Sequence, residues 1–395
     1  MEWVTRAPSF PRPARDCPGG ARFCLASAAL ALLVACGGRP DDSKPAPASS
    51  TDDTDAQVVN FANFADEVGP HTIADFERET GLRVNYQLYD TNAELEARLL
   101  VGRSGLDLVV PGNNFLQRGI AAGIYRPLDR ARLTNWKNLD PAILAKLAHN
   151  DPGNRYAVPY LWGTTSLGYN VDEVEAALGR PAPDSWSLLF DPANAARLQH
   201  CGIAVIDSGW IMVSAALLYL GRDPNSEREQ DLADAMKVLM AIRPYVRNIT
   251  TIPTGPSLAE GEYCLVVAPN ADIRTAREVA RAAGRSINLR YLIPREGALM
   301  WIDTLAIPVD APHPEQALRL IDYLMRPGVI ADVTNSIHFA NANAAATGFV
   351  DPHTRRDPTV YPDAADLARL HMNAALSDAY TRLVNREFTR FRTGH

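Results

Sequence analysis

The sequence of 395 residues lacks the signatures of several protein classes. It contains no HExxH pair, Walker loop, GxSxG or GxGxxG motif, and its eight histidines show no metal-like pairing. We therefore predict no catalytic residue, no metal and no cofactor. An excess of positive charge is also missing, because 39 Lys and Arg stand against 46 Asp and Glu, for a formal net charge of −7. An acidic surface repels nucleic acid and suits a cationic small ligand.

Long hydrophobic runs are scarce, and the run near the N-terminus is short. Arginine-bearing residues lead into the apolar segment 23–35, which is shorter than the ~20 residues that a transmembrane helix needs. We therefore expect residues 1–35 to be a signal peptide. The run ends in Leu33-Val-Ala-Cys36, which resembles the bacterial lipobox, so Cys36 is predicted to carry lipid. A plain signal peptide with an incidental cysteine is the alternative.

The segment after Cys36 is rich in Pro, Ser and Asp and cannot bury a core. We expect residues 36–56 to be a lipidated, disordered tether. No later apolar stretch is long enough to cross a bilayer, so the lipid is the expected membrane attachment.

Cysteine is also scarce, with five in the chain. Cys17 and Cys24 fall in the predicted signal peptide, and Cys36 is predicted to carry lipid. This leaves Cys201 and Cys264 as a pair in an oxidising compartment. A disulfide between these two is the expectation, and two free buried thiols are the alternative.

From residue 57 onward, short apolar strands alternate with amphipathic helices. This rhythm predicts a mostly parallel sheet covered by helices, with the ligand beyond the carboxyl ends of the strands. Residues 63–67 and 112–114 are then expected at the mouth of a site. Residues 155–170 are predicted to be paired extended segments that cross between two lobes. The expected strands are 58–61, 83–86, 107–110, 203–206, 264–267, 288–293 and 300–307, and the expected helices are 70–80, 93–101, 212–220, 232–243 and 314–325.

Carboxylates and aromatic residues follow several of these strands. A buried ammonium group needs a carboxylate, because an unpaired buried charge is costly. The methylene chain of a diamine packs on aromatic faces, which also attract the cation by roughly 0.5–2 kcal/mol. Ordinary explanations stay open: Asp66 could cap a helix, and Trp301 with Asp303 could be simple strand alternation. The set comprises Phe64, Asp66, Asp272, Trp301, Asp303 and Phe339, with Asn341 and Asn343 beside the last of these.

Long collinear stretches also carry a family resemblance. They are Asp107-Leu-Val-Val-Pro111, Pro127-Leu-Asp129, Trp136-Lys-Asn-Leu-Asp-Pro141, Val158-Pro-Tyr160, Gly168-Tyr-Asn-Val-Asp172, Tyr219-Leu-Gly-Arg-Asp-Pro-Asn-Ser226, Pro294-Arg-Glu-Gly-Ala298, Asp322-Tyr-Leu-Met-Arg-Pro327 and Ala340-Asn-Ala-Asn343. In these stretches the chain resembles the periplasmic putrescine-binding proteins of bacterial polyamine ABC transporters. The resemblance covers nearly all of the chain after the tether.

The resemblance implies an α/β, two-lobed periplasmic-binding-protein fold of type II. Each lobe would be a mixed sheet flanked by helices, with the ligand in the cleft between the lobes. Closure of the lobes around the ligand would create the form that the permease recognises. Residues 57–160 and 283–335 are expected in lobe 1, and residues 161–282 and 336–395 in lobe 2. The resemblance also supports the Cys201–Cys264 pairing.

Carried over residue by residue, the resemblance gives a ligand set with several departures. Asp66, Asp272 and Asp303 match carboxylates at the family's site, and Trp301 and Phe339 stand where the family has an aromatic wall and a Tyr. Ile211 stands where a Glu meets the second amine, so one end of the pocket should be more apolar and putrescine binding weaker. Ile211→Glu should then tighten putrescine binding, whereas Trp210 could supply a replacement wall. The other departures are Phe64 for a Trp, Ala65 and Gly112 for hydroxyl residues, Pro269 for a second Trp, and Glu67 where a Tyr is common.

These observations predict the substrate-binding component of an ABC importer. The expected ligand is a polyamine, with putrescine first and spermidine close behind. The expected protein is a monomer in the periplasm, anchored to a membrane only by lipid, with an inner-membrane ABC permease as its partner. A polyamine sensor reporting to a membrane signalling protein is the main rival. An amine-converting enzyme with a free reactive thiol is a more distant one.

Overall fold

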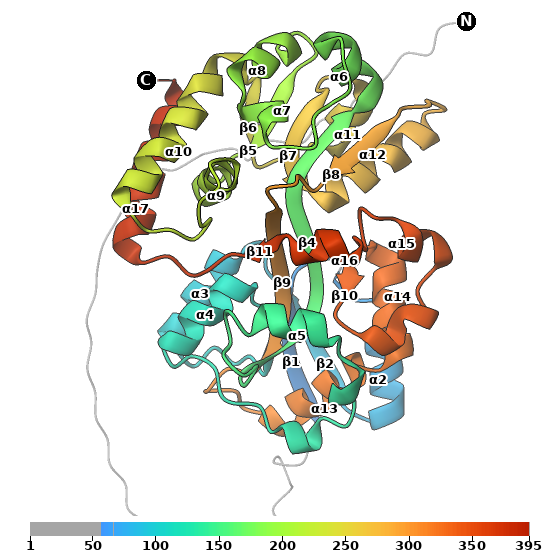
Figure 1. Cartoon of the computed structure of the whole chain (residues 1–395). Coiled ribbons are helices and arrows are strands. Elements are labelled where there is room, and N and C mark those ends of the chain that lie inside the picture. The colour runs from blue at the N-terminus through green and yellow to red at the C-terminus, as the bar shows by residue number, and fades with distance from the viewer. Residues whose placement is uncertain (1–56, 66, 395) are drawn as a thin grey trace, which may run out of the picture. The chain divides into compact units, whose positions relative to one another are not determined.

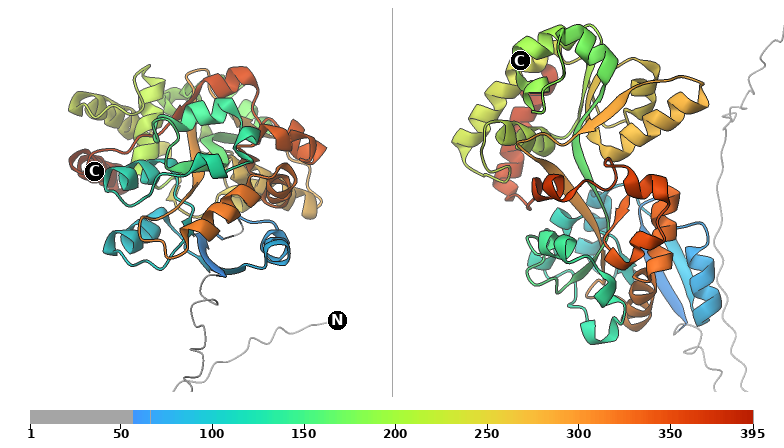
Figure 2. Two further views of the ribbon diagram at one scale, coloured as in Figure 1. Left: turned by 90° about the horizontal axis from the view of Figure 1, so that it is seen from below. Right: turned by 45° about the vertical axis from the view of Figure 1, so that its right-hand side comes forward.

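The computed structural model describes residues 57–65 and 67–394 (Figures 1 and 2). The predicted signal peptide, the lipidation site Cys36, the tether and the predicted ligand residue Asp66 lie outside the described residues. Within residues 57–394, none of the described helices combines the length and hydrophobicity needed to span a bilayer.

One mixed, 11-stranded sheet runs through the described part of the chain, in the order β2-β1-β3-β9-β4-β7-β5-β6. Strands β2, β1 and β3 are parallel, as are β7, β5 and β6. The prediction of a mostly parallel sheet is wrong for the centre, where β9 pairs antiparallel with β3 and with β4, and β4 pairs antiparallel with β7. The strands are β1 (Val58–Asn63), β2 (Arg83–Leu88), β3 (Leu108–Val109), β4 (Ala157–Asn170), β5 (Ile203–Ile206), β6 (Asn248–Thr250), β7 (Leu265–Pro269), β8 (Leu289–Leu292), β9 (Ala298–Ala306), β10 (Ala340–Asn341) and β11 (Leu370–Met372).

Several helices begin at a residue whose side chain caps them, as in α3, α5 and α6. The Asn170 side chain accepts from the backbone N–H groups of Asp172 and Glu173 at the start of α6. Helix α13 ends before Pro327. This proline is the first residue of α14, a position where the N–H that proline lacks would have no partner inside the helix. The α-helices are α2 (Thr72–Thr80), α3 (Asn92–Val101), α4 (Asn113–Ala121), α5 (Pro141–Leu147), α6 (Val171–Leu178), α7 (Ser187–Phe190), α8 (Pro192–Leu198), α9 (Gly209–Tyr219), α10 (Glu229–Ile242), α11 (Gly255–Glu260), α12 (Asn270–Ala282), α13 (Pro314–Leu324), α14 (Pro327–Ile337), α15 (Pro352–Arg356), α16 (Ala364–Ala368) and α17 (Asp378–Thr393).

The described residues form two lobes, each with hydrophobic core clusters on both faces of its part of the sheet. In lobe 1, the sheet buries alternate residues on its two faces, with Phe61 in one core cluster and Ala62 in the other. Leu265 and Val266 do the same in lobe 2. We use lobe 1 for residues 58–162 and 300–372, and lobe 2 for residues 165–292 and 376–394. Figure 1 shows lobe 1 in its lower part and lobe 2 in its upper part, with β4 running from one to the other.

These lobes differ from the expected ones in two segments. Strand β8, expected in lobe 1, pairs antiparallel with the last residues of β4 and packs in lobe 2. The stretch 340–372, expected in lobe 2, stays in lobe 1, because β10 pairs with Leu161 and Trp162 of β4 and β11 pairs with the first residues of β9. After this stretch, α17 returns to the lobe 2 core.

The crossing between the lobes is made by long strands. Residues 155–170 were predicted to be paired extended segments, but the structure has a single strand, β4, in which all 14 residues are buried. Its first half pairs with β9, and its second half pairs with β7 and β8 (Figure 2). A continuous strand therefore joins the two lobes.

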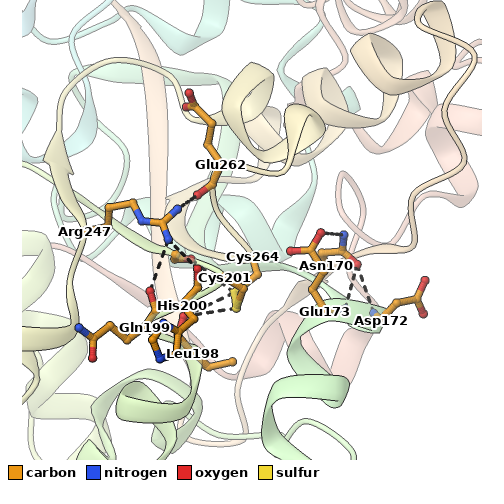
Figure 3. Close-up of a disulfide and its surroundings, with 11 residues drawn as sticks. Asn170, Asp172, Glu173, Leu198, Gln199, His200, Cys201, Arg247, Glu262 and Cys264 are labelled. Atoms are coloured by element: carbon orange, nitrogen blue, oxygen red, sulfur yellow. Dashed lines mark hydrogen bonds between the residues drawn. A yellow bond between two sulfur atoms is a disulfide. The ribbon is translucent and has the colours of Figure 1, made fainter.

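The expected disulfide between Cys201 and Cys264 is confirmed, with Cα atoms 5.4 Å apart. It ties the end of the α8 turn to the start of β7 within lobe 2. Figure 3 shows Arg247 nearby, whose guanidinium donates to the carbonyl of His200 (2.7 Å) and to the carbonyl of Glu262. The bridge and the arginine thus fasten the same two backbone segments.

Candidate ligand-binding site

A cleft of about 600 Å³ lies where the two lobes meet. Lobe 1 contributes the loop after β1, with Ala65 and Glu67, and Phe339 from the segment after α14. Lobe 2 contributes helix α12 through Ala271 and Arg274. The cleft is therefore lined by both lobes, so a molecule bound in it would contact both.

Hydrogen bonds from side chains to the main chain hold the loop that carries Glu67. The buried amide of Asn63 accepts from the N–H of Phe64 (2.8 Å) and donates to the carbonyl of Glu67 (3.3 Å). The hydroxyl of Tyr160, on β4, donates to the same carbonyl at 2.6 Å. These bonds engage only the main-chain carbonyl of Glu67, so they do not involve its carboxylate.

Lobe 1 holds two buried carboxylates: Glu67, which lines the cleft, and Asp303 of β9, which is not among the cleft's lining residues. They are only 6% and 8% exposed, and Oε2 of Glu67 has no hydrogen-bond partner among the described residues. Burial, and then the charge of Asp303, raise the pKa of Glu67 well above its usual value. Burial raises the pKa of Asp303 to about 7. No ion pair joins either carboxylate to a cationic side chain among the described residues.

Aromatic rings stand close to these acids. Trp301, two residues before Asp303 on β9, makes an edge contact with Phe339, with ring centroids 5.2 Å apart. The Trp301 ring also lies against the backbone of Gly163 on β4, where a Cβ would overlap it. Phe64 packs on Tyr89, with centroids 4.6 Å apart. The site thus offers negative charge beside flat apolar walls, which suits a cation attached to a hydrocarbon chain.

Comparison with known families agrees with this architecture. Residues 71–360 match the model of the bacterial extracellular solute-binding protein family. The chain belongs to this family. Its relatives are solute-binding proteins and not enzymes, as the absence of catalytic motifs had predicted.

Individual relatives of this solute-binding protein cover almost all of it. It is 40% identical over 341 residues to the putrescine-binding periplasmic protein SpuD of Pseudomonas aeruginosa, covering 86% of this chain and 93% of SpuD. It is 38% identical over 340 residues to the putrescine-binding periplasmic protein PotF of Escherichia coli, covering 86% of this chain and 92% of PotF.

Solved structures show the same fold. The substrate-binding protein PotD of a spermidine/putrescine ABC transporter from Streptococcus pneumoniae superposes with a TM-score of 0.76 at 22% identity, covering 86% of this chain and 99% of PotD. The Tp0655 (TpPotD) lipoprotein of Treponema pallidum superposes with a TM-score of 0.72 at 21% identity, covering 85% of this chain and 99% of the lipoprotein. The expected two-lobed fold is therefore confirmed.

Asp272 differs from the other acids of this solute-binding protein, because lobe 2 already supplies it with donors. Its Oδ2 accepts from the N–H (2.5 Å) and the hydroxyl (2.8 Å) of Thr254. Thr254 precedes the first residue of α11, so Asp272 holds the start of that helix. Burial raises the pKa of Asp272 in spite of these bonds.

Gly112 lies beside β9 in lobe 1, whereas Ile211 lies in lobe 2. The main chain of Gly112 forms an antiparallel β-bridge with that of Asp303, and its N–H donates to Oδ1 of Asn92 at 2.8 Å. Ile211 is 8% exposed and packs in the lobe 2 core, while its neighbour Trp210 lines a second cavity of about 120 Å³. Pro269 ends β7 immediately before α12.

Asn341 and Asn343 have structural roles that explain their burial. The Asn341 amide donates to the hydroxyls of Thr334 and Tyr361, and that of Asn343 donates to the carbonyl of Met325. Both asparagines thus hold the segment around β10 to its neighbours.

Sequence reasoning missed Arg274, which lines the cleft from lobe 2. Its guanidinium pairs with Glu278 at 2.7 Å and donates to the carbonyl of Ile337 in lobe 1 at 3.2 Å. Helical spacing alone gives no sign that this arginine, among several on α12, faces the other lobe.

Proposed function

We propose that this solute-binding protein binds a polyamine between its lobes and delivers it to an inner-membrane ABC permease. Putrescine is the first expected ligand and spermidine the second. The observation that carries the proposal is that lobe 1 buries two carboxylates, Glu67 and Asp303, with no ion-pair partner among the described residues. The same lobe supplies the contacting rings of Trp301 and Phe339. The relatives SpuD and PotF are named as putrescine-binding proteins, and PotD as part of a spermidine/putrescine transporter.

The chemistry of the cleft matches an alkyl amine better than an amino acid or a sugar. A carboxylate pair would repel the carboxylate of an amino acid, whereas each ammonium group of a polyamine needs an anionic partner once it leaves water. Because apolar rings flank the acids, the methylene chain can be buried against them.

The proposed ligand-binding set keeps the residues predicted from sequence. Asp303 has the strongest support, since it is buried and lacks a cationic partner among the described side chains. Asp272 has weaker support, because Thr254 already donates to it. The set comprises Phe64, Ala65, Asp66, Gly112, Ile211, Asp272, Trp301, Asp303 and Phe339.

The proposed location is the periplasm, with a lipid on Cys36 as the membrane anchor and the protein acting as a monomer. Support comes from the sequence Leu33-Val-Ala-Cys36, from relatives named as periplasmic, and from the lipoprotein of Treponema pallidum that shares the fold.

Titration calorimetry tests the proposed function. Protein that has been unfolded, washed and refolded is titrated with putrescine, agmatine and spermidine, and with glutamate and glycine betaine as controls. Only the polyamines should bind. Asp303→Asn should cost about 3 kcal/mol, or roughly a hundredfold in Kd, because a buried ammonium loses its partner. The proposal fails if no polyamine binds, and Asp303 lies outside the site if the variant changes Kd less than threefold.

A further inference from the structure

Helix α12 of lobe 2 carries a row of three polar residues that bond to lobe 1. Asn270, Arg274 and Arg277 stand at positions i, i+4 and i+7, so they share one face of the helix. The amide of Asn270 donates to the carbonyl of Thr359 at 2.8 Å. The guanidinium of Arg274 donates to the carbonyl of Ile337 at 3.2 Å. One face of α12 therefore forms a contact between the lobes.

Arg277, the last residue of this row, makes an ion pair with lobe 1. Its Nη1 donates to Oδ2 of Asp357 at 3.0 Å and to the hydroxyl of Thr359 at 3.1 Å. Its Nη2 donates to the carbonyl of Leu289 on β8 at 3.2 Å, which holds the guanidinium on the lobe 2 side. The described lining residues of the cleft do not include Arg277 or Asp357. The ion pair thus joins the lobes away from the surface that a ligand would touch.

Asp357 is oriented by its own turn in lobe 1. It follows the last residue of α15, and its Oδ1 accepts from the N–H of Thr359 at 2.9 Å, which leaves Oδ2 for the arginine. The side chains of Arg277 and Asp357 are 31% and 23% exposed. Ion pairs of flexible surface side chains are weak, because they lose side-chain entropy and are screened by water and salt. Here each partner is held by its own lobe and partly withdrawn from water, so both losses are smaller.

Asn270 and Arg277 lie at different distances from the crossing strand. Oδ1 of Asn270 accepts from the N–H of Thr164 at 3.3 Å, where β4 passes from one lobe to the other. Arg277 is two turns further along α12, or about 10 Å at a rise of ~1.5 Å per residue. A rotation of about 15–20° around Asn270 would carry Arg277 by about 3 Å, enough to break its bonds to lobe 1. We therefore expect the ion pair of Arg277 to break when the lobes part, while Asn270 stays near β4.

We propose that Arg277 controls the release of the ligand without touching it, because its ion pair with Asp357 exists only while the lobes are together. The inference rests on the proposed polyamine function for the identity of the ligand, but not for the contact between the lobes. A ligand that both lobes contact leaves when the lobes part, so a bond that opposes parting lengthens its residence time. The ligand enters before the ion pair forms, so the rate of entry does not depend on it.

Stopped-flow tryptophan fluorescence measures how fast the full chain binds and releases putrescine. Arg277→Glu should raise koff about tenfold, because an attraction becomes a repulsion, and leave kon within about twofold. Asp357→Arg should have the same effect, and the two changes together should bring koff back to within about twofold of the wild type. Arg281→Glu makes the same charge change at an exposed position one turn further along α12. It is the matched control and should leave koff unchanged. A purely structural role for Arg277 would lower Tm and slow binding, with no recovery in the double variant.

A second measurement separates this inference from the proposed function. Spin labels are attached through Val101→Cys in lobe 1 and Ile252→Cys in lobe 2, both at exposed positions, and pulsed electron resonance measures the distance between them without ligand. Arg277→Glu should reduce the share of molecules with the shorter distance, and the double variant should restore it. If this pattern is seen and putrescine fails to bind, the ligand is wrong and the contact stands. If putrescine binds, and koff is unchanged in Arg277→Glu or does not recover in the double variant, the inference is overturned. If putrescine does not bind, an unchanged distance overturns it.

Discussion

Arg274 of lobe 2 donates a 3.2 Å hydrogen bond to the carbonyl of Ile337, the last residue of α14 in lobe 1. Both residues line the cleft, so the bond joins the lobes at the site itself. The carboxyl end of a helix carries partial negative charge, and a guanidinium there is favourable. The contact therefore stabilises the arrangement in which the two lobes lie on either side of the cleft.

Arg274→Ala should weaken putrescine binding about tenfold, because a charge-assisted hydrogen bond that favours closure is lost. Calorimetry measures the affinity, and small-angle scattering should show a more extended protein. Arg281→Ala removes the same charge from an exposed position on the same helix and should change neither result. Equal effects of the two variants would mean that only the net charge of α12 matters.

Asp303→Asn should stabilise the unliganded protein more at pH 8 than at pH 5. Burial raises the pKa of Asp303 in the folded protein from 3.8 to about 7. Between these two pH values the folded protein therefore binds more protons than the unfolded chain. Stability must then fall as pH rises through this window. Thermal unfolding at both pH values measures the effect. A gain in Tm that is the same at pH 5 and pH 8 would contradict the raised pKa.

Gly163→Ala should reduce ligand affinity about tenfold by displacing the Trp301 ring, because a new Cβ would overlap the ring and overpacking costs roughly 1–3 kcal/mol. Calorimetry and tryptophan fluorescence report the change. Gly328→Ala is the control, since its Cβ would meet open space. Wild-type affinity in Gly163→Ala would show that the Trp301 wall can shift without loss.

Replacing both Cys201 and Cys264 by Ser should lower the free energy of unfolding by about 4 kcal/mol, as expected from freeing a long loop in the chain-entropy model. Their separation is 63 residues. Denaturant unfolding of the variant and of oxidised wild type measures the difference. Affinity for putrescine should stay unchanged, because the bridge lies inside lobe 2. If both thiols of the native, unreduced protein alkylate freely, no bridge exists.

Cys36→Ser should release the protein from the membrane fraction, because the lipid is the expected attachment. Fractionation of cells expressing each form tests this. Cys24→Ser, within the predicted signal peptide, is the control and should leave the distribution unchanged. Membrane association that persists in Cys36→Ser would point to a plain signal peptide and another attachment.

The sequence predicted local elements better than their arrangement. Strand β5 and helix α13 were placed within one residue of their bounds, because apolar runs and an initial proline define them locally. The antiparallel centre of the sheet and the return of 340–372 to lobe 1 depend on pairings between distant strands, which no local pattern encodes.

The same limit applies to the site. Asp303 was expected at the site from an acid and an aromatic residue on one strand and from the family resemblance, and its contact with a ligand stays a prediction. The effect of the Asp303 charge on Glu67, and the hydrogen bonds that Thr254 donates to Asp272, require the folded chain, because the partners are separated in sequence. Arg274 likewise became notable only through its contact with Ile337.

Strand β4 has a consequence for how the molecule unfolds. Val158 and Leu161 pack in the core of lobe 1, and Leu167 and Tyr169 of the same strand pack in the core of lobe 2. If one core unfolds, the half of β4 in that core loses its packing partners. The other half of the strand is then less well held, so its hydrogen bonds in the second lobe are weakened. We therefore expect the two lobes to unfold as one cooperative unit and not as independent folding domains.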